Sequence, residues 1–374
     1  MKRFSVSQRF EFLDGLRGIA ALGVILFHFN GTLKDHDIFI IPCWLDFLCQ
    51  GGHYGVQIFF VLSGFVIAYS LRHEQFSFSY CLRFFLKRSI RLDPPYWSIL
   101  GLMVLLNFLG NFLFDKKGEH LVTAPQILLN LFYLPDLVQV PRILPVAWTL
   151  CIEIQFYLTF VLLLQIQQFL VNQFYSIPGF IFSHLIFGLL LILSLLEKTS
   201  WAILSIPGLF VPYWYHFFIG CLICWRMLGF IRASWFWAYF GIIGSYSLIQ
   251  GSLEALVTLV IAFIIYMVAL LGGMHHLLTS RFFQYTGKIS YSLYLIHWPI
   301  GMKFIDISFR LFRNEMHHIW SIAALMTISW MLTFLVAHCF YYLIESPSLS
   351  LSRRLTVGSS NKNCQILVTN RMLS

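Results

Sequence analysis

Apolar runs of about 20 residues follow one another through this sequence and leave few folds open to it. A helix needs roughly that length to cross the hydrocarbon core of a bilayer. Charged residues make up 11% of the 374 and hydrophobic residues 59%, too little polarity for the surface of a water-soluble domain. The sequence therefore predicts an all-α integral membrane protein with about ten transmembrane helices, centred on residues 11–30, 52–71, 95–113, 147–169, 177–196, 203–228, 234–251, 255–272, 286–306 and 318–343.

The basic residues predict the orientation of these helices. With the N-terminus in the cytoplasm, the inner segments carry about twice as many Lys and Arg as the outer ones, as expected from the positive-inside rule. Both termini are therefore predicted to be cytoplasmic. The net charge of +9 lies in short loops, so we expect lipid headgroups rather than nucleic acid as its partner. Residues 1–345 are predicted to form the transmembrane domain, and 346–374 a polar, poorly ordered cytoplasmic tail.

Cysteines and prolines allow further local predictions. Cys43 and Cys49 fall in one predicted outer loop and could pair in an oxidising compartment. A CxxC pair within an apolar run, Cys221 and Cys224, is typical of small packing residues rather than of a redox site. Two prolines near the start of the run at 203–228, Pro207 and Pro212, predict a kink or a re-entrant entry there.

The first apolar run carries charged and imidazole side chains. Asp14 and Arg17 also argue against a cleavable signal peptide, because a signal sequence has an uncharged apolar core. Arg17 and His28 are separated by about three helical turns and so share one face, while Asp14 lies one turn before Arg17. Gly15 and Gly18 would let another helix approach closely. A functional site on this face is one interpretation; the other is that Asp14 and Arg17 reach the interface and His28 is a satisfied interior histidine.

Two later runs also place polar groups where lipid is expected. Glu153 lies inside the fourth run, where it needs a partner and could orient a histidine or form a structural ion pair. Ser290, Tyr294 and His297 fall on one stripe of the ninth run. Such a stripe can line a polar path or hold helices together, and the pattern alone favours neither.

A basic segment precedes the third run. Arg83, Lys87 and Arg91 share one helical face, and Arg88 flanks it. One interpretation is an amphipathic helix on anionic lipid. The other is an anion clamp for the phosphates of a nucleotide-like donor, since guanidinium groups offer paired hydrogen-bond donors.

The order of the motifs resembles that of a known family. Over residues 10–347 the chain is similar to the membrane-bound acyltransferase-3 family, whose members O-acylate surface glycans. Six elements occur in the family's order: Arg17 with His28, Phe59-Phe60-x-x-Ser63-Gly64-Phe65, Arg88-x-x-Arg91, Trp148-x-Leu150-x-x-Glu153-x-x-Phe156-Tyr157, Ser290-x-x-x-Tyr294-x-x-His297, and Glu345-x-Pro347.

The resemblance implies a role for each matching position. His28 would be the essential catalytic residue, with Arg17 and Glu153 in support, and Arg88 and Arg91 would bind acyl-CoA from the cytoplasm. No metal and no permanently bound cofactor are expected; acetyl-CoA would be the donor substrate. The remaining motif residues would line the substrate pocket: Asp14, Ser63, Trp148, Ser290, Tyr294, His297 and Glu345.

The resemblance also implies the reaction. The chain would be a multi-pass O-acetyltransferase of the bacterial inner membrane, acting on a hydroxyl of a surface or lipid-linked carbohydrate such as lipopolysaccharide O-antigen. It would be the form without a fused esterase-like domain. His28 would take the hydroxyl proton directly, or carry the acyl group in a relay. A transporter or flippase for a glycan precursor is the alternative function, and neither the sugar nor the oligomeric state is fixed by the sequence.

Overall fold

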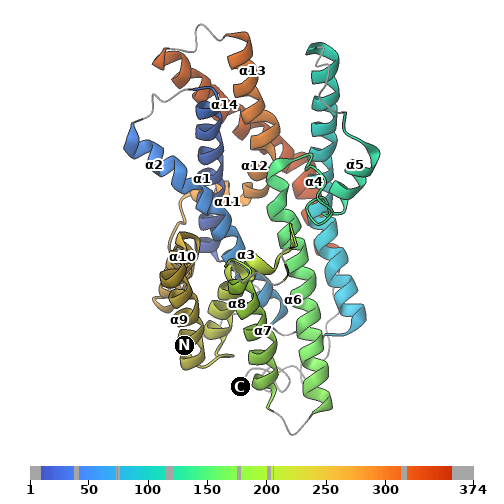
Figure 1. The fold of residues 1–374 in the computed structure, drawn as a ribbon, viewed down its shortest axis with the longest axis vertical. Coiled ribbons are helices and arrows are strands. Elements are labelled where there is room, and N and C mark those ends of the chain that lie inside the picture. Colours follow the sequence, from blue (N-terminus) through green and yellow to red (C-terminus); the bar gives the residue numbers. More distant parts are fainter. Residues whose placement is uncertain are drawn as a thin grey trace. The chain divides into compact units, whose positions relative to one another are not determined.

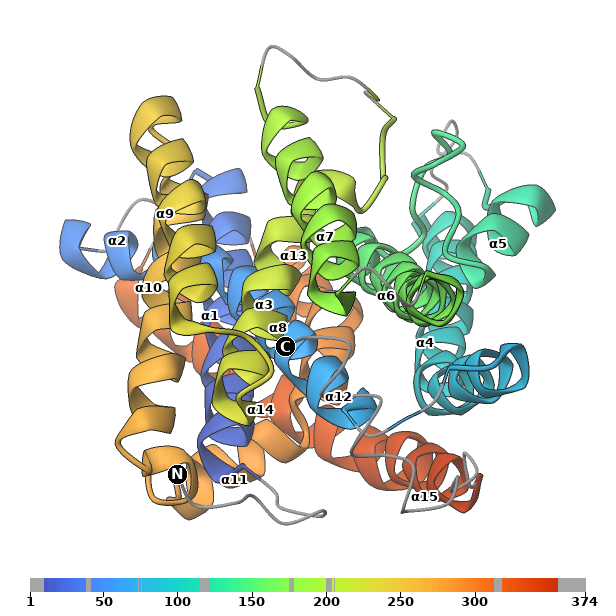
Figure 2. The same ribbon diagram turned by 90° about the horizontal axis from the view of Figure 1, so that it is seen from below.

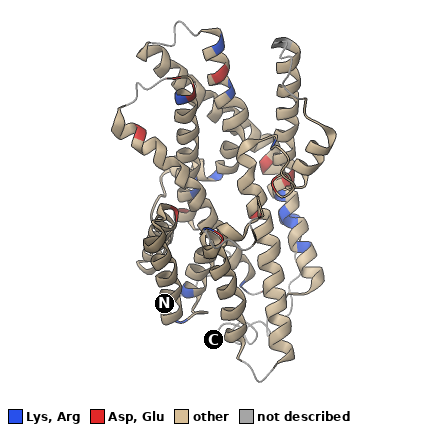
Figure 3. Cartoon of the chain, in the orientation of Figure 1, with Lys and Arg blue, Asp and Glu red and all other residues tan. Residues whose placement is uncertain are grey.

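The computed structural model describes residues 10–37, 42–72, 74, 76–114, 121–174, 178–199, 204, 206–312 and 318–355 (Figure 1). Within these ranges the regular structure is helical throughout, without a strand, as the sequence predicts. Seven helical segments are long and apolar enough to cross a membrane: Glu11–Asp35, Cys43–Leu71, Phe78–Phe112, Pro145–Gln173, Gly179–Leu196, Leu253–Leu270 and Ile319–Arg354. Charged residues are sparse along them (Figure 3).

Three of the ten predicted spans do not form one long apolar helix each. The run at 203–228 becomes a 3-10 turn, η3 (Val211–Tyr213), and a short helix, α8 (Trp214–Leu228), so that the helix starts after Pro207 and Pro212. Helix α9 (Ala233–Gln250) carries several Ser, Tyr and Gly residues and is not among the seven. The run at 286–306 is divided among four short helices. A count of ten spans and cytoplasmic termini therefore stay predictions.

The chain divides into two compact units, and the predicted extent of the transmembrane domain, 1–345, stays a prediction. Unit 1 comprises Met1–Leu62 and Val260–Tyr341, and unit 2 comprises Ser63–Leu259 and Tyr342–Ser374. Helices α3 (Gly55–Leu71) and α10 (Leu253–Leu270) contribute residues to both. The other helices of unit 1 are α1 (Glu11–Asp35), α2 (Cys43–Gly51), η1 (Gly52–Tyr54), η4 (Gly273–His275), α11 (Arg281–Lys288), α12 (Ser290–Ile296), the π-helix η5 (His297–Met302), α13 (Lys303–Leu311) and α14 (Ile319–Phe340).

Unit 1 is organised around α1, which packs against α11 and α12 (Figures 1 and 2). The crossing of α1 and α11 is tight because glycines line it. A Cβ atom at Gly18 would meet Thr286, and one at Gly287 would collide with the backbone carbonyl of Asp14. The close approach predicted from Gly15 and Gly18 is thus confirmed, and it fixes the rotation of α1 that determines where His28 points.

Unit 2 contains the long helices of the middle of the chain. Besides its parts of α3 and α10, it holds η3, α8 and α9, together with α4 (Phe78–Phe114), α5 (Ala124–Leu131), η2 (Pro145–Ala147), α6 (Trp148–Gln173), α7 (Gly179–Leu196), most of the π-helix η7 (Tyr341–Glu345) and α15 (Ser346–Arg354). Helices α6, α7 and α8 pack in chain order around stacked aromatic rings, such as Phe156 and Phe217 at 4.1 Å between centroids (Figure 2). Gly64 of α3 leaves no room for a Cβ against the backbone of Phe217.

Helix α4 joins two segments that the sequence analysis treated separately. The basic segment around Arg83–Arg91 and the third predicted span form one helix of 37 residues that continues through Pro94 and Pro95. Prolines remove backbone donors, but membrane helices tolerate them where neighbouring groups satisfy the freed carbonyls. Figure 3 shows Lys and Arg gathered along the first half of this helix. The basic segment is therefore an extension of a span rather than a separate surface helix.

One local prediction needs revision, the pairing of two cysteines. Cys43 and Cys49 lie on α2, six residues apart, which separates their Cα atoms by about 9 Å along the axis, beyond the reach of a disulfide. Both thiols are free, with Cys43 exposed and Cys49 buried, so the two do not pair. The segment predicted as a tail begins with helix α15, Ser346–Arg354, which packs on α4; the rest of the tail lies outside the described residues.

Candidate functional site

Unit 1 brings together two histidines that lie 269 residues apart in the sequence. Nδ1 of His28 on α1 is 3.2 Å from Nε2 of His297, and the two rings stack at 5.1 Å between centroids. His297 is fully buried and His28 is half-buried. The indole of Trp298 meets the edge of the His28 ring at 5.4 Å. The imidazole of His28 is thus held by aromatic contacts, by its contact with His297 and by the backbone carbonyl of Val24, with part of its surface still accessible.

The local fold explains how His297 reaches α1. The chain changes from α-helix to π-helix at this residue, and Pro299 two positions later has no backbone N–H to continue the α-helical ladder. Tyr294, one turn earlier, is also buried, with its ring 5.7 Å from His297 and 5.9 Å from Phe59. Tyr294 and His297 therefore line one site with His28, as their shared stripe allows.

The other predicted residues of the first helix are placed differently. Arg17 lies about three turns before His28 on the same regular helix and is half-buried. In the described part of the chain it forms no hydrogen bond or ion pair, so it is not paired with Asp14 there. Asp14 lies at the tight crossing of α1 with α11, where its backbone carbonyl faces Gly287.

In unit 2, Glu153 is the centre of a second polar cluster. The hydroxyl of Ser63 donates to its Oε1 at 2.5 Å, and the hydroxyl of Tyr157 donates to the same atom. The Ser63 and Tyr157 hydroxyls are themselves 3.4 Å apart. Among the described residues no histidine is bonded to Glu153. This carboxylate therefore accepts hydrogen bonds from hydroxyl groups. No contact among the described residues supports the interpretation that it orients a histidine.

Arg88 lies beside this cluster. Its guanidinium carbon is 4.8 Å from the centre of the Tyr157 ring and 5.4 Å from that of Phe84. It makes no hydrogen bond or ion pair within the described chain, so its N–H groups stay available to an anion. Arg91, one turn further along α4, is half-buried. The cluster thus presents the guanidinium group of Arg88, with aromatic rings behind it and a hydroxyl-bound carboxylate nearby.

The remaining predicted site residues are spread over both units. Trp148 begins α6 and packs on Tyr213 at 5.5 Å between rings. Ser290 begins α12, and its buried hydroxyl has no hydrogen-bond partner within the described ranges. Glu345 is almost fully buried where η7 meets α15.

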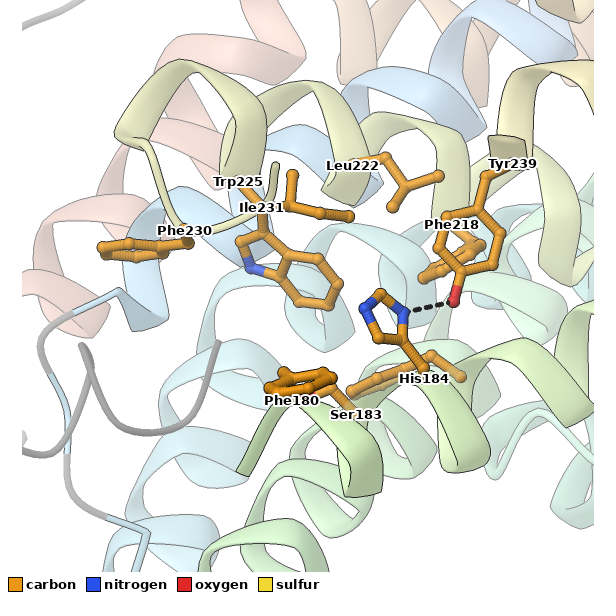
Figure 4. A pocket seen from close by; sticks show the side chains of 10 residues that line it. Phe180, Ser183, His184, Phe218, Leu222, Trp225, Phe230, Ile231 and Tyr239 are labelled. Atoms are coloured by element: carbon orange, nitrogen blue, oxygen red, sulfur yellow. Dashed lines mark hydrogen bonds between the residues drawn. The ribbon is translucent and has the colours of Figure 1, made fainter. Parts of the chain in front are cut away.

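A further cavity of unit 2 lies among α7, α8 and α9 (Figure 4). Its walls are mostly aromatic, and the Nδ1 atom of His184 pairs with the hydroxyl of Tyr239 at 2.7 Å. The cavity has a volume of about 20 Å³, close to that occupied by one water molecule. It is too small to hold an acyl donor or a sugar.

The structure adds two groups that the sequence reasoning left out of the site. Tyr157 contacts both Glu153 and Arg88, and its position four residues after Glu153 could have identified it as a neighbour on the same helical face. The carbonyl of Leu293 lies 3.3 Å from Nδ1 of His297. A backbone acceptor leaves no signal in the amino-acid sequence. Within the described ranges, His, Cys, Asp and Glu form no group of three or more that could hold a metal ion.

Comparison with known proteins gives one match over most of the chain. A family model described as "Acyltransferase domain" matches residues 10–342. A Staphylococcus aureus (strain COL) protein provisionally named an O-acetyltransferase is 30% identical over 185 residues, which are 46% of this chain and 27% of that protein. The Peptidoglycan O-acetyltransferase OatA of Listeria monocytogenes is 30% identical over 156 residues, 39% of this chain and 22% of that protein.

A third relative, the O-acetyltransferase OatA of Staphylococcus aureus (strain NCTC 8325 / PS 47), is 30% identical over 171 residues, 43% of this chain and 25% of its own length. The aligned part is thus about a quarter of each of these curated relatives. No solved structure matches the chain.

Proposed function

Because this chain belongs to the acyltransferase-3 family, we propose that it transfers an acetyl group from cytoplasmic acetyl-CoA to a hydroxyl of a surface or lipid-linked carbohydrate. The multi-pass membrane character and the acyltransferase family supply the frame of this proposal. One observation carries the chemistry: His28 is partly accessible, and its Nδ1 lies 3.2 Å from Nε2 of His297.

In the proposed reaction His28 acts as a general base. Its Nε2 takes the proton of the acceptor hydroxyl while the hydroxyl oxygen attacks the thioester carbonyl. The carbon–oxygen bond of the ester forms, the carbon–sulfur bond of the thioester breaks, and the proton passes to the departing CoA thiolate. In the competing route the acetyl group is first transferred to the imidazole of His28 and then to the sugar.

The donor is proposed to bind through the basic part of α4. Arg88 and Arg91 suit its phosphates because guanidinium groups carry a fixed charge and paired N–H donors. The ring of Tyr157 packs against Arg88, and the hydroxyl of Tyr157 donates to Glu153. These contacts support the position of the Arg88 side chain. Glu153 is accordingly proposed to act in the binding cluster, through Tyr157 and Ser63.

The acceptor is proposed to be a glycan hydroxyl presented at the bacterial inner membrane. The name of the Listeria relative specifies peptidoglycan for that protein. The sequence resemblance equally accommodates lipopolysaccharide O-antigen. Mass spectrometry of both glycans from cells with and without the gene distinguishes them, because O-acetylation adds one acetyl mass to whichever polymer is the acceptor.

The test of the proposal uses the full chain in membranes with labelled acetyl-CoA. We expect the wild-type protein to release CoA and to label a carbohydrate, and His28→Ala to lower this rate by about 10²-fold or more at unchanged expression. His276→Gln, at an exposed histidine of the same unit, is the matched control and should keep full activity. An active, well-expressed His28→Ala protein, or glycan-precursor flux without donor consumption, would overturn the proposal.

A further inference from the structure

The His28–His297 contact bears on which ring nitrogens carry hydrogen. In a neutral imidazole one nitrogen is a hydrogen-bond donor and the other is an acceptor. The carbonyl oxygen of Leu293, 3.3 Å from Nδ1 of His297, can only accept. Nδ1 of His297 must therefore carry the hydrogen. The other nitrogen of this ring, Nε2, then has a lone pair and acts as an acceptor.

The same reasoning continues into His28. Nε2 of His297 lies 3.2 Å from Nδ1 of His28, so this Nδ1 must be the donor. In a neutral ring the lone pair of His28 is then on Nε2. The backbone carbonyl of Val24, one turn earlier on α1, is a second acceptor for the His28 ring, as the carbonyl of Leu293 is for His297. The carbonyl of Leu293, acting through His297, and the carbonyl of Val24 thus both favour the tautomer of His28 with its hydrogen on Nδ1.

We propose that His297 is a positioning residue that holds His28 with its hydrogen on Nδ1 and leaves Nε2 to take the proton of the acceptor hydroxyl. The inference rests on the proposed role of His28 and adds a residue that acts through it. Burial assigns the two roles: His297 is fully enclosed with both nitrogens bonded, whereas His28 is partly accessible. His297 therefore does not touch the substrate.

The surroundings of His297 support a fixed ring. The rings of Tyr294 and His28 contact it on two sides, and the π-helix that it begins packs on α14 and α1. Gly301 in the same π-helix fits tightly against Phe29 and Thr333, so this segment cannot slide along its neighbours without a collision. A ring held in this way can set the orientation of its partner.

The experiment compares two substitutions of His297 in the full chain in membranes. In His297→Gln an amide oxygen can still accept the hydrogen of His28 Nδ1, whereas His297→Leu offers no acceptor. We expect the leucine variant to lose about 10²- to 10⁴-fold in kcat, the range seen when an orienting group is removed from a catalytic histidine. The glutamine variant should keep at least about tenfold more activity than the leucine variant, since one correct hydrogen bond remains.

Two further readouts separate this role from a structural one. KM for acetyl-CoA should stay within about threefold of the wild-type value in both variants, because His297 acts on the chemical step and not on donor binding. His338→Gln, which removes an exposed histidine of the same unit, controls for loss of an imidazole elsewhere and should leave kcat unchanged. Thermal melting of each purified variant checks that it is folded.

The outcomes are distinguishable. If the wild-type protein turns over no acetyl-CoA, the proposed function fails and this inference fails with it. If turnover depends on His28 but His297→Leu keeps the wild-type kcat, only the role of His297 is wrong. Equal losses in the folded glutamine and leucine variants would also contradict the inference, because the acceptor atom would then be irrelevant.

Discussion

Arg88 lies over two aromatic rings and forms no ion pair within the described chain, and this arrangement determines how a substitution should act. A lysine ammonium keeps the charge but lacks the flat surface and the paired donors of a guanidinium. At the scale of single residues, the binding of the donor should therefore depend on the shape of the group as well as on its charge.

The prediction concerns Arg88→Lys. We expect KM for acetyl-CoA to rise by about tenfold, equivalent to roughly 1.4 kcal/mol of binding, with little change in kcat. Steady-state kinetics with membranes or purified protein measure both constants. Arg83→Gln is the matched control: Arg83 is an exposed arginine of the same helix, with its Nε bonded to the carbonyl of Ser79. A normal KM in Arg88→Lys, or an equal rise in the control, would argue against donor binding at Arg88.

Single residues also show where sequence reasoning stops. The stripe of Tyr294 and His297 was found from helical spacing, but its contact with His28 was not, because nothing in the spacing links two segments 269 residues apart. Conversely, the interpretation that Glu153 orients a histidine assumed that its hydrogen-bond partner is an imidazole. In the structure its partners are the hydroxyls of Ser63 and Tyr157. A buried carboxylate demands hydrogen-bond donors, and the sequence does not say which ones.

At the scale of helices, the crossing of α1 and α11 depends on the absence of side chains. Gly287→Ala would force a Cβ atom into the carbonyl of Asp14, so the helices would have to separate. We expect a loss of about 1–3 kcal/mol in stability, the range typical of overpacked cores, and a lower melting temperature in detergent.

Activity should fall as well in this variant, because the same crossing sets the rotation of α1. Gly31→Ala on α1 is the control: a Cβ atom there meets no atom within 4 Å, and alanine favours helix. Its melting temperature should be equal to or above that of the wild type. An unchanged melting temperature in Gly287→Ala would show that the crossing is looser than described.

A helix could be predicted from the sequence where a long, uninterrupted apolar run is enough to form it. The first span was placed well, because α1 (Glu11–Asp35) has an uninterrupted apolar run. The run at 286–306 was predicted as one span without its irregularities, since the break after Lys288 and the π-helix at His297 depend on packing and on Pro299. Apart from Pro299, the amino-acid sequence gives no signal for these interruptions.

At the scale of the whole chain, the orientation in the membrane is the main prediction still to be measured. Charge asymmetry places the segment before α3 on the outer side. Cys43 on that segment is exposed, and Cys49 on the same helix is buried. A membrane-impermeant maleimide should therefore label Cys43 in right-side-out vesicles, and Cys43→Ser should remove this labelling while Cys49→Ser preserves it. Labelling only after permeabilisation would reverse the predicted orientation.

The π-helix at His297–Met302 has a consequence for how the length of this segment can vary. A π-turn contains one residue more than the α-turn that it replaces, so it is equivalent to a single-residue insertion into an α-helix. Deleting one residue between Trp298 and Met302 would replace the π-turn by an α-turn, so helix α13 would keep the face that it presents to its neighbours. The change would be confined to the turn itself, which carries Trp298 against the ring of His28. This segment can therefore absorb a change of one residue in length without rotating the helix that follows, and the cost falls on the surroundings of the histidine pair.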